Sequence, residues 1–318
     1  MTSSTAPTRR NFVRHAVAQA AVLASPLPAA QPRGLKFYVH WDMDGGNGIF
    51  TREQSWYWEE GVRKHIAEEA RAIFTAQVNA ASSAALASGA TELIVCDTHH
   101  GGGNLIQDRL LHDPRITYHY RSVGMEAGKR RWMPGLDETV AGLMLPGHHA
   151  KAGTPGAFLP HTWSGTWEDF TINGQSVGEI GIEACYAGYW DVPLIFVQGD
   201  ESACTEAQSQ FPGVVTSSVK KAVTAELAKG LDTDAAHRET GRGIAEAIAT
   251  AKTGRLRPFK PSAPMTVTVR MTTVEAAAKA AARPGVRRIG DRTLEGRVER
   301  QCDVVRWLLG TGLDMAPQ

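Results

Sequence analysis

The chain has 318 residues, 42% of them hydrophobic, so it is long enough to form one large or two modest domains with a buried core. Its formal net charge is only +1, and the 34 basic residues include three arginines within residues 1–30, a segment without acids. Without that segment, 31 basic residues face 33 acidic ones, a net charge of −2. This balance excludes the strongly basic surface expected of a nucleic-acid-binding protein.

Residues 1–30 are typical of an export signal. Residues 8–13 (Thr-Arg-Arg-Asn-Phe-Val) match the twin-arginine pattern, an alanine-rich stretch follows, and residues 28–30 (Pro-Ala-Ala) suit a cleavage site. The alternative is an ordinary basic N-terminal helix. The apolar stretch is too short and too interrupted by polar residues to anchor the chain in a membrane. We therefore expect a periplasmic or secreted protein that leaves the cell by the twin-arginine route.

The first predicted element of the mature chain is a strand over residues 35–40. Asp42 and Asp44 follow it directly, and Gly45 and Gly46 come next. Two carboxylates presented at the end of a strand can bind one divalent ion or be shared by two. The same pattern also occurs in plain loops and in calcium-binding loops. The assignment of a metal site therefore depends on residues that come later in the chain.

Two further predicted strands end in ligand-type side chains. A long helix is expected over residues 54–87 and a buried strand over residues 92–96, which makes a βαβ unit and predicts a parallel sheet. Asp97, His99 and His100 follow that strand, and His148 and His149 follow an apolar stretch at residues 140–145. Because the C-terminal ends of parallel strands meet at one edge, we expect these residues to gather there.

The next segment adds a histidine and several acids. His161 follows the third cluster, and a short strand near residue 171 is expected to turn at residues 173–174. The helix that begins near residue 177 carries Glu179 in its first turn and Glu183 one turn later. Glu179 is either a metal ligand or an ordinary acid that complements the helix dipole. After a strand at residues 192–198, Asp200 is a site acid or the cap of the next helix.

Beyond residue 200 the sequence has no dense ligand cluster. Helices are expected over residues 201–211, 225–252 and 276–282, a strand over 265–271, and a strand running into a helix over 293–309. We predict an α/β protein with a parallel or mixed sheet flanked by helices and with metal ligands at the C-terminal strand ends. The expected division is a signal at 1–30, a catalytic domain at 31–200 and a smaller α/β part at 201–318 for support or oligomerisation.

The four cysteines and the glycine patterns exclude several classes of site. Cys96, Cys185, Cys204 and Cys302 have no C-x-x-C spacing, which excludes a zinc ribbon and leaves a disulfide open. Neither a phosphate-binding loop nor a G-x-G-x-x-G motif is present, so no nucleotide cofactor is predicted.

Five of the clustered side chains suggest a transition-metal site. They offer three carboxylates and two imidazoles, a mixture that suits zinc, manganese or cobalt better than calcium: Asp42, Asp44, His99, His149 and Glu179. Five donors suffice for two ions if one carboxylate bridges them. Amide hydrolysis by metal-activated water is the simplest chemistry for such a pair. His161 is then the candidate for handling protons or steadying an oxyanion.

These motifs, in this order, resemble the M55 family of zinc-dependent D-aminopeptidases. The similar stretches are residues 42–45 (Asp-Met-Asp-Gly), 97–99 (Asp-Thr-His), 147–156 (Gly-His-His-Ala-Lys-Ala-Gly-Thr-Pro-Gly), 160–161 (Pro-His) and 177–179 (Val-Gly-Glu). The resemblance runs from about residue 35 to residue 200 and is looser beyond.

The resemblance implies a binuclear zinc site and a peptidase that removes N-terminal D-residues, such as D-alanine, from short peptides. Asp42 would bridge the ions, Asp44, His99, His149 and Glu179 would complete their ligands, and His161 would be catalytic. Asp97 and Thr154, and Glu183 if it faces the site, are candidates for supporting the ligands from behind. The family also implies a ring-built decamer.

Three features depart from the family pattern. Asp44 stands where the family usually has Glu, and Glu183 stands where it often has Asn; we expect Glu183 to be solvated rather than to face the site. The export signal suggests work on envelope peptides that contain D-amino acids. Two other functions stay open: hydrolysis of another small amide or lactone, and metal-dependent binding of a peptide or solute without turnover.

Overall fold

A seven-stranded sheet, in the order β3-β2-β1-β4-β7-β8-β9, is the frame of the protein. This computed structural model describes Met1, residues 35–120 and residues 132–309, so the expected export signal lies outside the described residues. The strands are β1 Lys36–Trp41, β2 Glu92–Asp97, β3 Ile116–His119, β4 Gly142–His148, β7 Leu194–Asp200, β8 Val215–Thr224 and β9 Leu227–Gly230. All neighbours pair in parallel except β8 and β9, which confirms the predicted mixed α/β architecture.

The strand order reverses between β1 and β4 at the centre of the sheet. From β1 the chain adds β2 and β3 on one side, and from β4 it adds β7 and β8 on the other. The loops that leave β1 and β4 therefore diverge at the C-terminal strand ends, which is where open α/β sheets bind their ligands. Asp42 and Asp44 follow β1, and His149 follows β4, so the fold brings the predicted ligands to this point.

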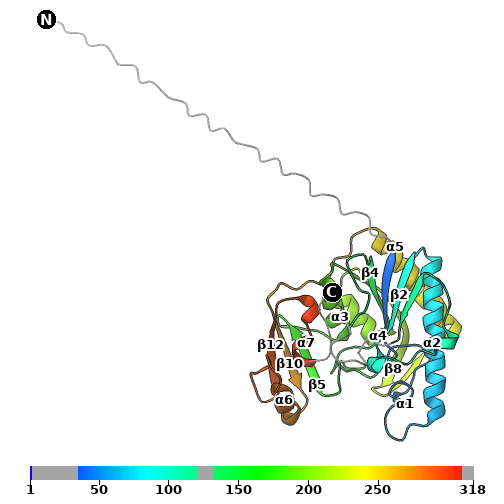
Figure 1. The fold of residues 1–318 in the computed structure, drawn as a ribbon, viewed down its shortest axis with the longest axis horizontal. Coiled ribbons are helices and arrows are strands. Elements are labelled where there is room, and N and C mark those ends of the chain that lie inside the picture. Colours follow the sequence, from blue (N-terminus) through cyan, green and yellow to red (C-terminus); the bar gives the residue numbers. More distant parts are fainter. Residues whose placement is uncertain (2–34, 121–131, 310–318) are drawn as a thin grey trace. The chain divides into compact units, whose positions relative to one another are not determined.

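Helices cover both faces of this sheet, as Figure 1 shows: α2 Lys64–Ala87 and α5 Thr233–Lys252 on one face, α3 Glu179–Gly188 and α4 Glu201–Gln210 on the other. Successive side chains along β1 point to opposite faces of this sheet. Phe37 and Val39 pack with α2 and α5, whereas Tyr38 packs on the side of α3. Each such large side chain, fully withdrawn from water, stabilises the fold by about 1.5–3 kcal/mol.

A second, antiparallel sheet packs against the far side of α3 (Figure 1). Its order is β11-β12-β10-β5-β6, with β5 Trp167–Ile172, β6 Gln175–Ser176, β10 Met265–Met271, β11 Arg287–Arg288 and β12 Thr293–Val298, and with the helices α6 Val274–Ala281 and α7 Arg306–Leu309 beside it. The turn expected at residues 173–174 joins β5 to β6, with both residues at positive φ (50° and 81°).

The helix expected over residues 54–87 is interrupted. Thr51 and Gln54 form a capping box that starts the one-turn helix α1 Arg52–Ser55, and the chain then leaves the helical path until α2 begins at Lys64. Gly61, at φ 91°, lies in this break. The prediction of a continuous helix was therefore wrong over residues 56–63.

The C-terminal part of the chain also differs from expectation. Residues 227–230 form β9 rather than the start of a helix, and β8 was not predicted, because its sequence mixes buried and exposed polar residues. The strands β8 and β9 complete the first sheet, and β5 and β6, which precede residue 200, pair within the second.

Three further observations concern the described residues. All four cysteines are buried free thiols. No helix within residues 35–120 and 132–309 has the length and apolarity needed to cross a membrane. Asp200 caps α4 by accepting a hydrogen bond from the backbone N–H of Ala203, as one of its two predicted roles required.

Gly147 should be indispensable to the close approach of the chain after β4 to the chain after β1. It has φ 75°, and a Cβ there would lie 1.9 Å from the carbonyl oxygen of Asp42. We expect Gly147→Ala to reduce the free energy of unfolding by about 2–5 kcal/mol, through backbone strain and overpacking together. The control is Gly153→Ala, which has φ 76° and an open surrounding and should cost only about 1–2 kcal/mol. Equal losses in the free energy of unfolding for Gly147→Ala and Gly153→Ala, measured by urea unfolding, would contradict this account.

Candidate metal centre

Asp42 lies where the chain turns away from β1. Its side chain is almost completely buried, and its Oδ1 accepts hydrogen bonds from the backbone N–H groups of Met43 and Asp44. The carboxylate thus holds the turn that follows it. Its Oδ2 stays directed to the side of His149, 3.6 Å from that ring's Nε2.

Asp44 is held from one side only. Its Oδ1 accepts hydrogen bonds from the Ser55 hydroxyl and from Trp56 Nε1, the latter at 2.9 Å. Its Oδ2 faces His99 Nδ1 at 3.7 Å and His161 Nε2 at 3.8 Å. The segment wrongly predicted as helix begins with Trp56, so the break in the helix is what supplies this contact.

The three histidines share one arrangement. In each, a ring N–H donates to a backbone carbonyl: His99 Nε2 to Ser55 at 2.9 Å, His149 Nδ1 to Ala150 at 3.0 Å, and His161 Nδ1 to Leu159 at 2.8 Å. A carbonyl can only accept, so these nitrogens carry the hydrogens. The opposite ring nitrogen of each histidine is left for the carboxylates or for a metal ion.

Those opposite nitrogens converge on the carboxylates. His99 Nδ1 lies 2.7 Å from Asp42 Oδ1, and His149 Nε2 lies 3.2 Å from Glu179 Oε1. His161 Nε2 lies 3.6 Å from the same Glu179 oxygen, and its ring stacks on that of His149 with 3.8 Å between centroids. Glu179 is in the first turn of α3, and the backbone N–H of Trp163 donates to it at 2.7 Å.

These atoms form three overlapping groups whose members lie within 4.8 Å of one another: Asp42, Asp44 and His99; Asp42, His149 and Glu179; and Asp44, His149 and His161. The first two groups contain all five predicted ligands and share Asp42. His149 Nε2 is buried without a hydrogen-bond donor or acceptor at bonding geometry. A buried nitrogen lone pair among carboxylates fits a transition-metal ion, which takes both kinds of donor.

The electrostatics of the cluster favour positive charge at this point. Burial opposes charge on His149, but Glu179 and Asp42 outweigh it and raise the pKa of that ring well above its usual value. For His99, burial is likewise outweighed, by Asp44 and Asp42, and the pKa rises to about 9. The histidines in turn lower the pKa values of Asp42 and Glu179 against the effect of burial. The carboxylates of Asp42 and Glu179 are therefore anionic and attract cations.

Strained backbone adjoins the cluster. His100, Leu159 and Trp163 are not glycines, yet they have φ values of 49°, 47° and 63°. Each lies beside a functional contact: His100 follows His99, the carbonyl of Leu159 accepts from His161, and the N–H of Trp163 donates to Glu179. Residues in this conformation cost about 1–3 kcal/mol and tend to mark functional sites.

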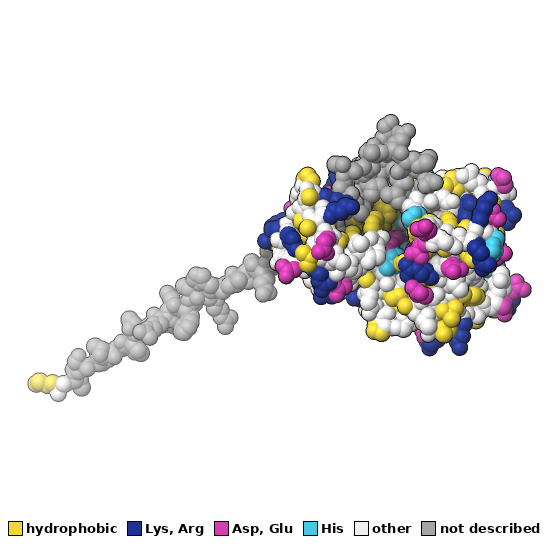
Figure 2. Space-filling view, turned by 90° about the horizontal axis from the view of Figure 1, so that it is seen from below, with side chains coloured by type: hydrophobic (Ala, Val, Ile, Leu, Met, Phe, Trp, Pro, Cys, Tyr) yellow, Lys and Arg dark blue, Asp and Glu magenta, His cyan; other side chains and the backbone are white. Residues whose placement is uncertain are grey.

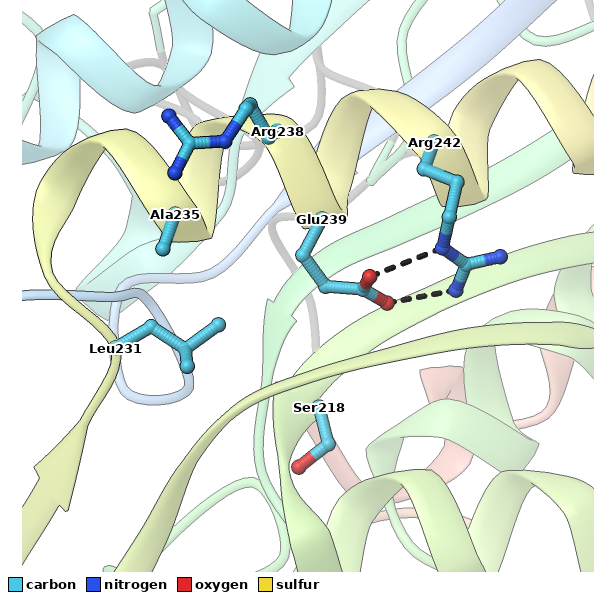
Figure 3. A pocket seen from close by; sticks show the side chains of 6 residues that line it. All are labelled: Ser218, Leu231, Ala235, Arg238, Glu239 and Arg242. Atoms are coloured by element: carbon cyan, nitrogen blue, oxygen red, sulfur yellow. Dashed lines mark hydrogen bonds and ion pairs between the residues drawn. The ribbon is translucent and has the colours of Figure 1, made fainter.

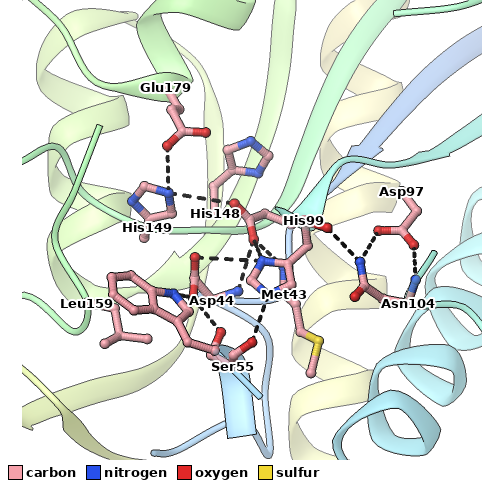
Figure 4. A network of polar contacts seen from close by, with 12 residues as sticks. Met43, Asp44, Ser55, Asp97, His99, Asn104, His148, His149, Leu159 and Glu179 are labelled. Atoms are coloured by element: carbon pink, nitrogen blue, oxygen red, sulfur yellow. Dashed lines mark hydrogen bonds and ion pairs between the residues drawn. The ribbon is translucent and has the colours of Figure 1, made fainter. Parts of the chain in front are cut away.

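Asp97 and Thr154 were both expected to support the ligands, but only Asp97 contacts a residue that holds one of them in place. Asp97 accepts hydrogen bonds from the backbone and side chain of Asn104, whose amide also donates to the carbonyl of His99, so it orders the loop that carries this histidine (Figure 4). Thr154 is in a turn closed by a hydrogen bond from its N–H to Lys151. Among the described residues, the Thr154 side chain forms no hydrogen bond with the cluster.

The expectation that Glu183 is solvated was wrong. Its side chain is fully buried, and its Oε2 lies 2.9 Å from His40 Nδ1 and 3.1 Å from His148 Nε2. His40 and His148 precede the ligand-bearing turns after β1 and β4, so Glu183 joins the two central strands from behind the cluster. Burial opposes its charge, but His40 and His148 outweigh it and lower the pKa of Glu183 to about 2.

Sequence reasoning missed three contributors to the site. Ser55 and Trp56 were hidden in a predicted helix, although the capping-box pattern and Gly61 signalled a break. Lys220, in an unpredicted strand, is buried and hydrogen-bonds the loop after Asp44. Burial lowers the pKa of Lys220 to about 7, against the effect of Asp200, Asp44 and Asp42. No sequence signal distinguishes this lysine from a surface lysine.

The surface offers a second hollow that is not part of this site. It measures about 540 Å³ and is lined by Ser218, Leu231, Ala235, Arg238, Glu239 and Arg242 (Figure 3). Glu239 and Arg242 pair with each other within it. None of its lining residues belongs to the cluster. In the cluster itself, His161 has the most exposed side chain, at 17%, and Figure 2 shows histidine side chains reaching the surface beside acidic ones.

Comparisons with known proteins point to one family. The M55 peptidase family model, described as D-aminopeptidase, matches residues 35–309. A D-aminopeptidase of Bacillus subtilis (strain 168) is 31% identical over 229 residues, which are 71% of this chain and 78% of that protein. The structure of the Zn-dependent D-aminopeptidase DppA from Bacillus subtilis, a self-compartmentalizing protease, is similar, with a TM-score of 0.77 and 28% identity over 86% of this chain and 95% of that one.

The buried Glu183 should make stability depend on pH. A carboxylate whose pKa falls from 4.5 to about 2 on folding stabilises the protein above pH 4.5 and loses that contribution as the pH falls toward 2. We expect Glu183→Gln to reduce the free energy of unfolding by about 1–3 kcal/mol at pH 6, and the difference from the unaltered protein to shrink as the pH falls.

The matched control is Glu246→Gln, which removes an exposed carboxylate paired with Arg242 and should cost at most about 0.5 kcal/mol. A difference between Glu183→Gln and the unaltered protein that stays constant from pH 6 to pH 2 would contradict the assignment.

Proposed function

The chain belongs to the M55 family of D-aminopeptidases, and we propose that it releases N-terminal D-amino acids, such as D-alanine, from short peptides at a site for two zinc ions. It is a metallo-peptidase of that family. The observation that carries the proposal is the pair of ligand groups that share Asp42, because one bridging carboxylate lets five side chains serve two ions.

The side chains divide into two sets around Asp42. Asp44 and His99 would hold one ion, and His149 and Glu179 the other. Zinc held there supplies Lewis-acid chemistry, which polarises an amide carbonyl and lowers the pKa of water. The protein's own contribution is orientation: the carbonyls of Ser55 and Ala150 fix the rings of His99 and His149 with one nitrogen toward the carboxylates.

His161 is suited to proton transfer. Its Nδ1 is tied to the carbonyl of Leu159, so its Nε2 is free to take or give a proton at the rim of the cluster. It is also more exposed than the proposed ligands, which allows exchange with solvent. Its place beside Glu179 and Asp44 puts it near any amide bound to the ions.

We further propose that the protein acts outside the cytoplasm, on peptides derived from the cell envelope. The support is the twin-arginine pattern at residues 8–13, and envelope peptides are an abundant source of D-amino acids. Assembly into a closed homo-oligomer, a decamer by the family resemblance, would suit a peptidase similar to one titled self-compartmentalizing. A single-chain mass in sedimentation equilibrium would contradict the assembly.

The substrate assignment predicts a clear difference between stereoisomers. We expect zinc-loaded protein to hydrolyse D-Ala-D-Ala and not L-Ala-L-Ala, with activity lost to a chelator and restored by zinc. The measurement is release of free alanine on protein of known metal content. Hydrolysis of neither peptide, with zinc bound, would point to another small amide; hydrolysis of the L-peptide alone would overturn the assignment.

The role of His161 predicts a loss of rate without a loss of metal. We expect His161→Gln to reduce kcat about 10²–10⁴-fold while the zinc content stays unchanged. His112→Gln, which alters an exposed histidine away from the cluster, is the control and should leave both values as they are. If zinc content falls together with the rate, His161 is a ligand in the group with Asp44 and His149.

The export proposal predicts dependence on the arginine pair. Replacing Arg9 and Arg10 together by lysine should keep the full-length chain in the cytoplasm, because the twin-arginine route requires the pair. Cell fractionation with immunoblotting measures this. Mature protein that is cytoplasmic even with both arginines present would contradict the proposal.

A further inference from the structure

Lys220 is the only lysine or arginine that is buried within the described part of the chain, with 3% of its surface exposed. It comes from β8, opposite Asp200 of β7. Its Nζ lies 4.2 Å from the centre of the Phe158 ring, which contributes a favourable cation–π contact. A charge withdrawn from water to this extent needs partners that satisfy all of its donors.

The partners of Lys220 all lie in the loop that carries the proposed ligands. Its Nζ donates to the carbonyl oxygen of Asp44, to that of Gly46 at 3.0 Å and to that of Ile49 at 2.6 Å. An ammonium group has three N–H donors, and here each has an acceptor. One side chain therefore fixes three peptide groups within six residues of a loop.

Other contacts hold the same loop at different points. The side-chain amide of Gln77 accepts from the N–H of Asn47 and donates to its carbonyl, both at 2.7 Å. The N–H of Gly45 donates to the carbonyl of Gly147 at 2.6 Å. This bond and the bond from Lys220 to the carbonyl of Asp44 hold the two ends of one peptide group, the one that directly follows the proposed ligand Asp44.

We propose that Lys220 is a positioning residue for the metal centre: its ammonium group fixes the loop from Asp44 to Ile49 and thereby the direction in which the Asp44 carboxylate points. Lys220 touches neither the proposed zinc positions nor a substrate, so its effect on chemistry passes through Asp44. This inference rests on the proposed function, since it concerns the same ligand set.

The test compares Lys220→Met with Lys221→Met in the mature protein. The neighbouring Lys221 has a side chain 64% exposed and pairs with Glu201, so it is a matched control. Zinc affinity is measured against a competing chelator, and the visible absorption of the Co²⁺-loaded protein reports the ligand geometry independently of activity.

We expect Lys220→Met to bind zinc about 10–100-fold more weakly, with an altered cobalt spectrum and a reduced kcat at nearly unchanged KM. Lys221→Met should match the unaltered protein in all of these. Lys220→Gln keeps two N–H donors but no charge, so its zinc affinity, cobalt spectrum and kcat should lie between those of Lys220→Met and Lys221→Met. It provides the measurement if Lys220→Met does not fold.

The outcomes separate this inference from the proposed function. If Lys220→Met or Lys220→Gln has a lower melting temperature but unchanged zinc affinity, cobalt spectrum and kcat, Lys220 is merely structural and the inference is overturned. If the unaltered protein binds zinc but cleaves no D-peptide, the substrate assignment fails, while zinc affinity and the cobalt spectrum still decide the role of Lys220. If the unaltered protein binds no zinc, both fail.

Discussion

The convergence of three carboxylates, two of them buried, is the constraint on which the rest of this structure depends. Oxygens of Asp42 lie within 4.8 Å of those of Asp44 and of Glu179. At that separation two unit charges repel by about 3–4 kcal/mol in the effective dielectric of a protein. The surrounding groups offset this repulsion: histidines face the carboxylates, N–H and O–H groups donate hydrogen bonds to them, and Lys220 lies behind the loop that follows Asp44. A cluster of this kind needs positive charge at its centre to be stable in water. A metal ion supplies that charge and is therefore its natural occupant.

The sequence allowed the ligand-bearing strand ends at the centre of the molecule to be predicted. Much of the structure around them could not be predicted. Strand ends bearing Asp42 and Asp44, His99, and His149 were recognisable because apolar runs stopped at ligand-type residues, and parallel strands bring such ends together. The break after Ser55 was missed because the alanine-rich helical pattern that follows it was extended back to residue 54. The strand β8 was missed because Lys220 and its polar neighbours obscure the alternation. Glu183 was assigned to solvent because sequence alone does not reveal that His40 and His148 face it.

The two departures from the family pattern have different meanings in the structure. Asp44 is one methylene shorter than Glu, yet its carboxylate reaches the cluster, and the Ser55 hydroxyl and Trp56 indole hold it there. Glu183 adds a negative charge where an amide is common in the family. This carboxylate contacts two histidines and lies behind the proposed ligands, so it supports the strand ends instead of competing for the ions. Both departures therefore leave the set of five ligands intact.

The central claim is that these five side chains hold two zinc ions with Asp42 between them. The most direct measurement is anomalous scattering from crystals of the zinc-loaded mature protein, with data collected on both sides of the zinc absorption edge. The account predicts two peaks, one between Asp42, Asp44 and His99 and the other between Asp42, His149 and Glu179. A single peak, or peaks bound by side chains outside this set, would contradict it.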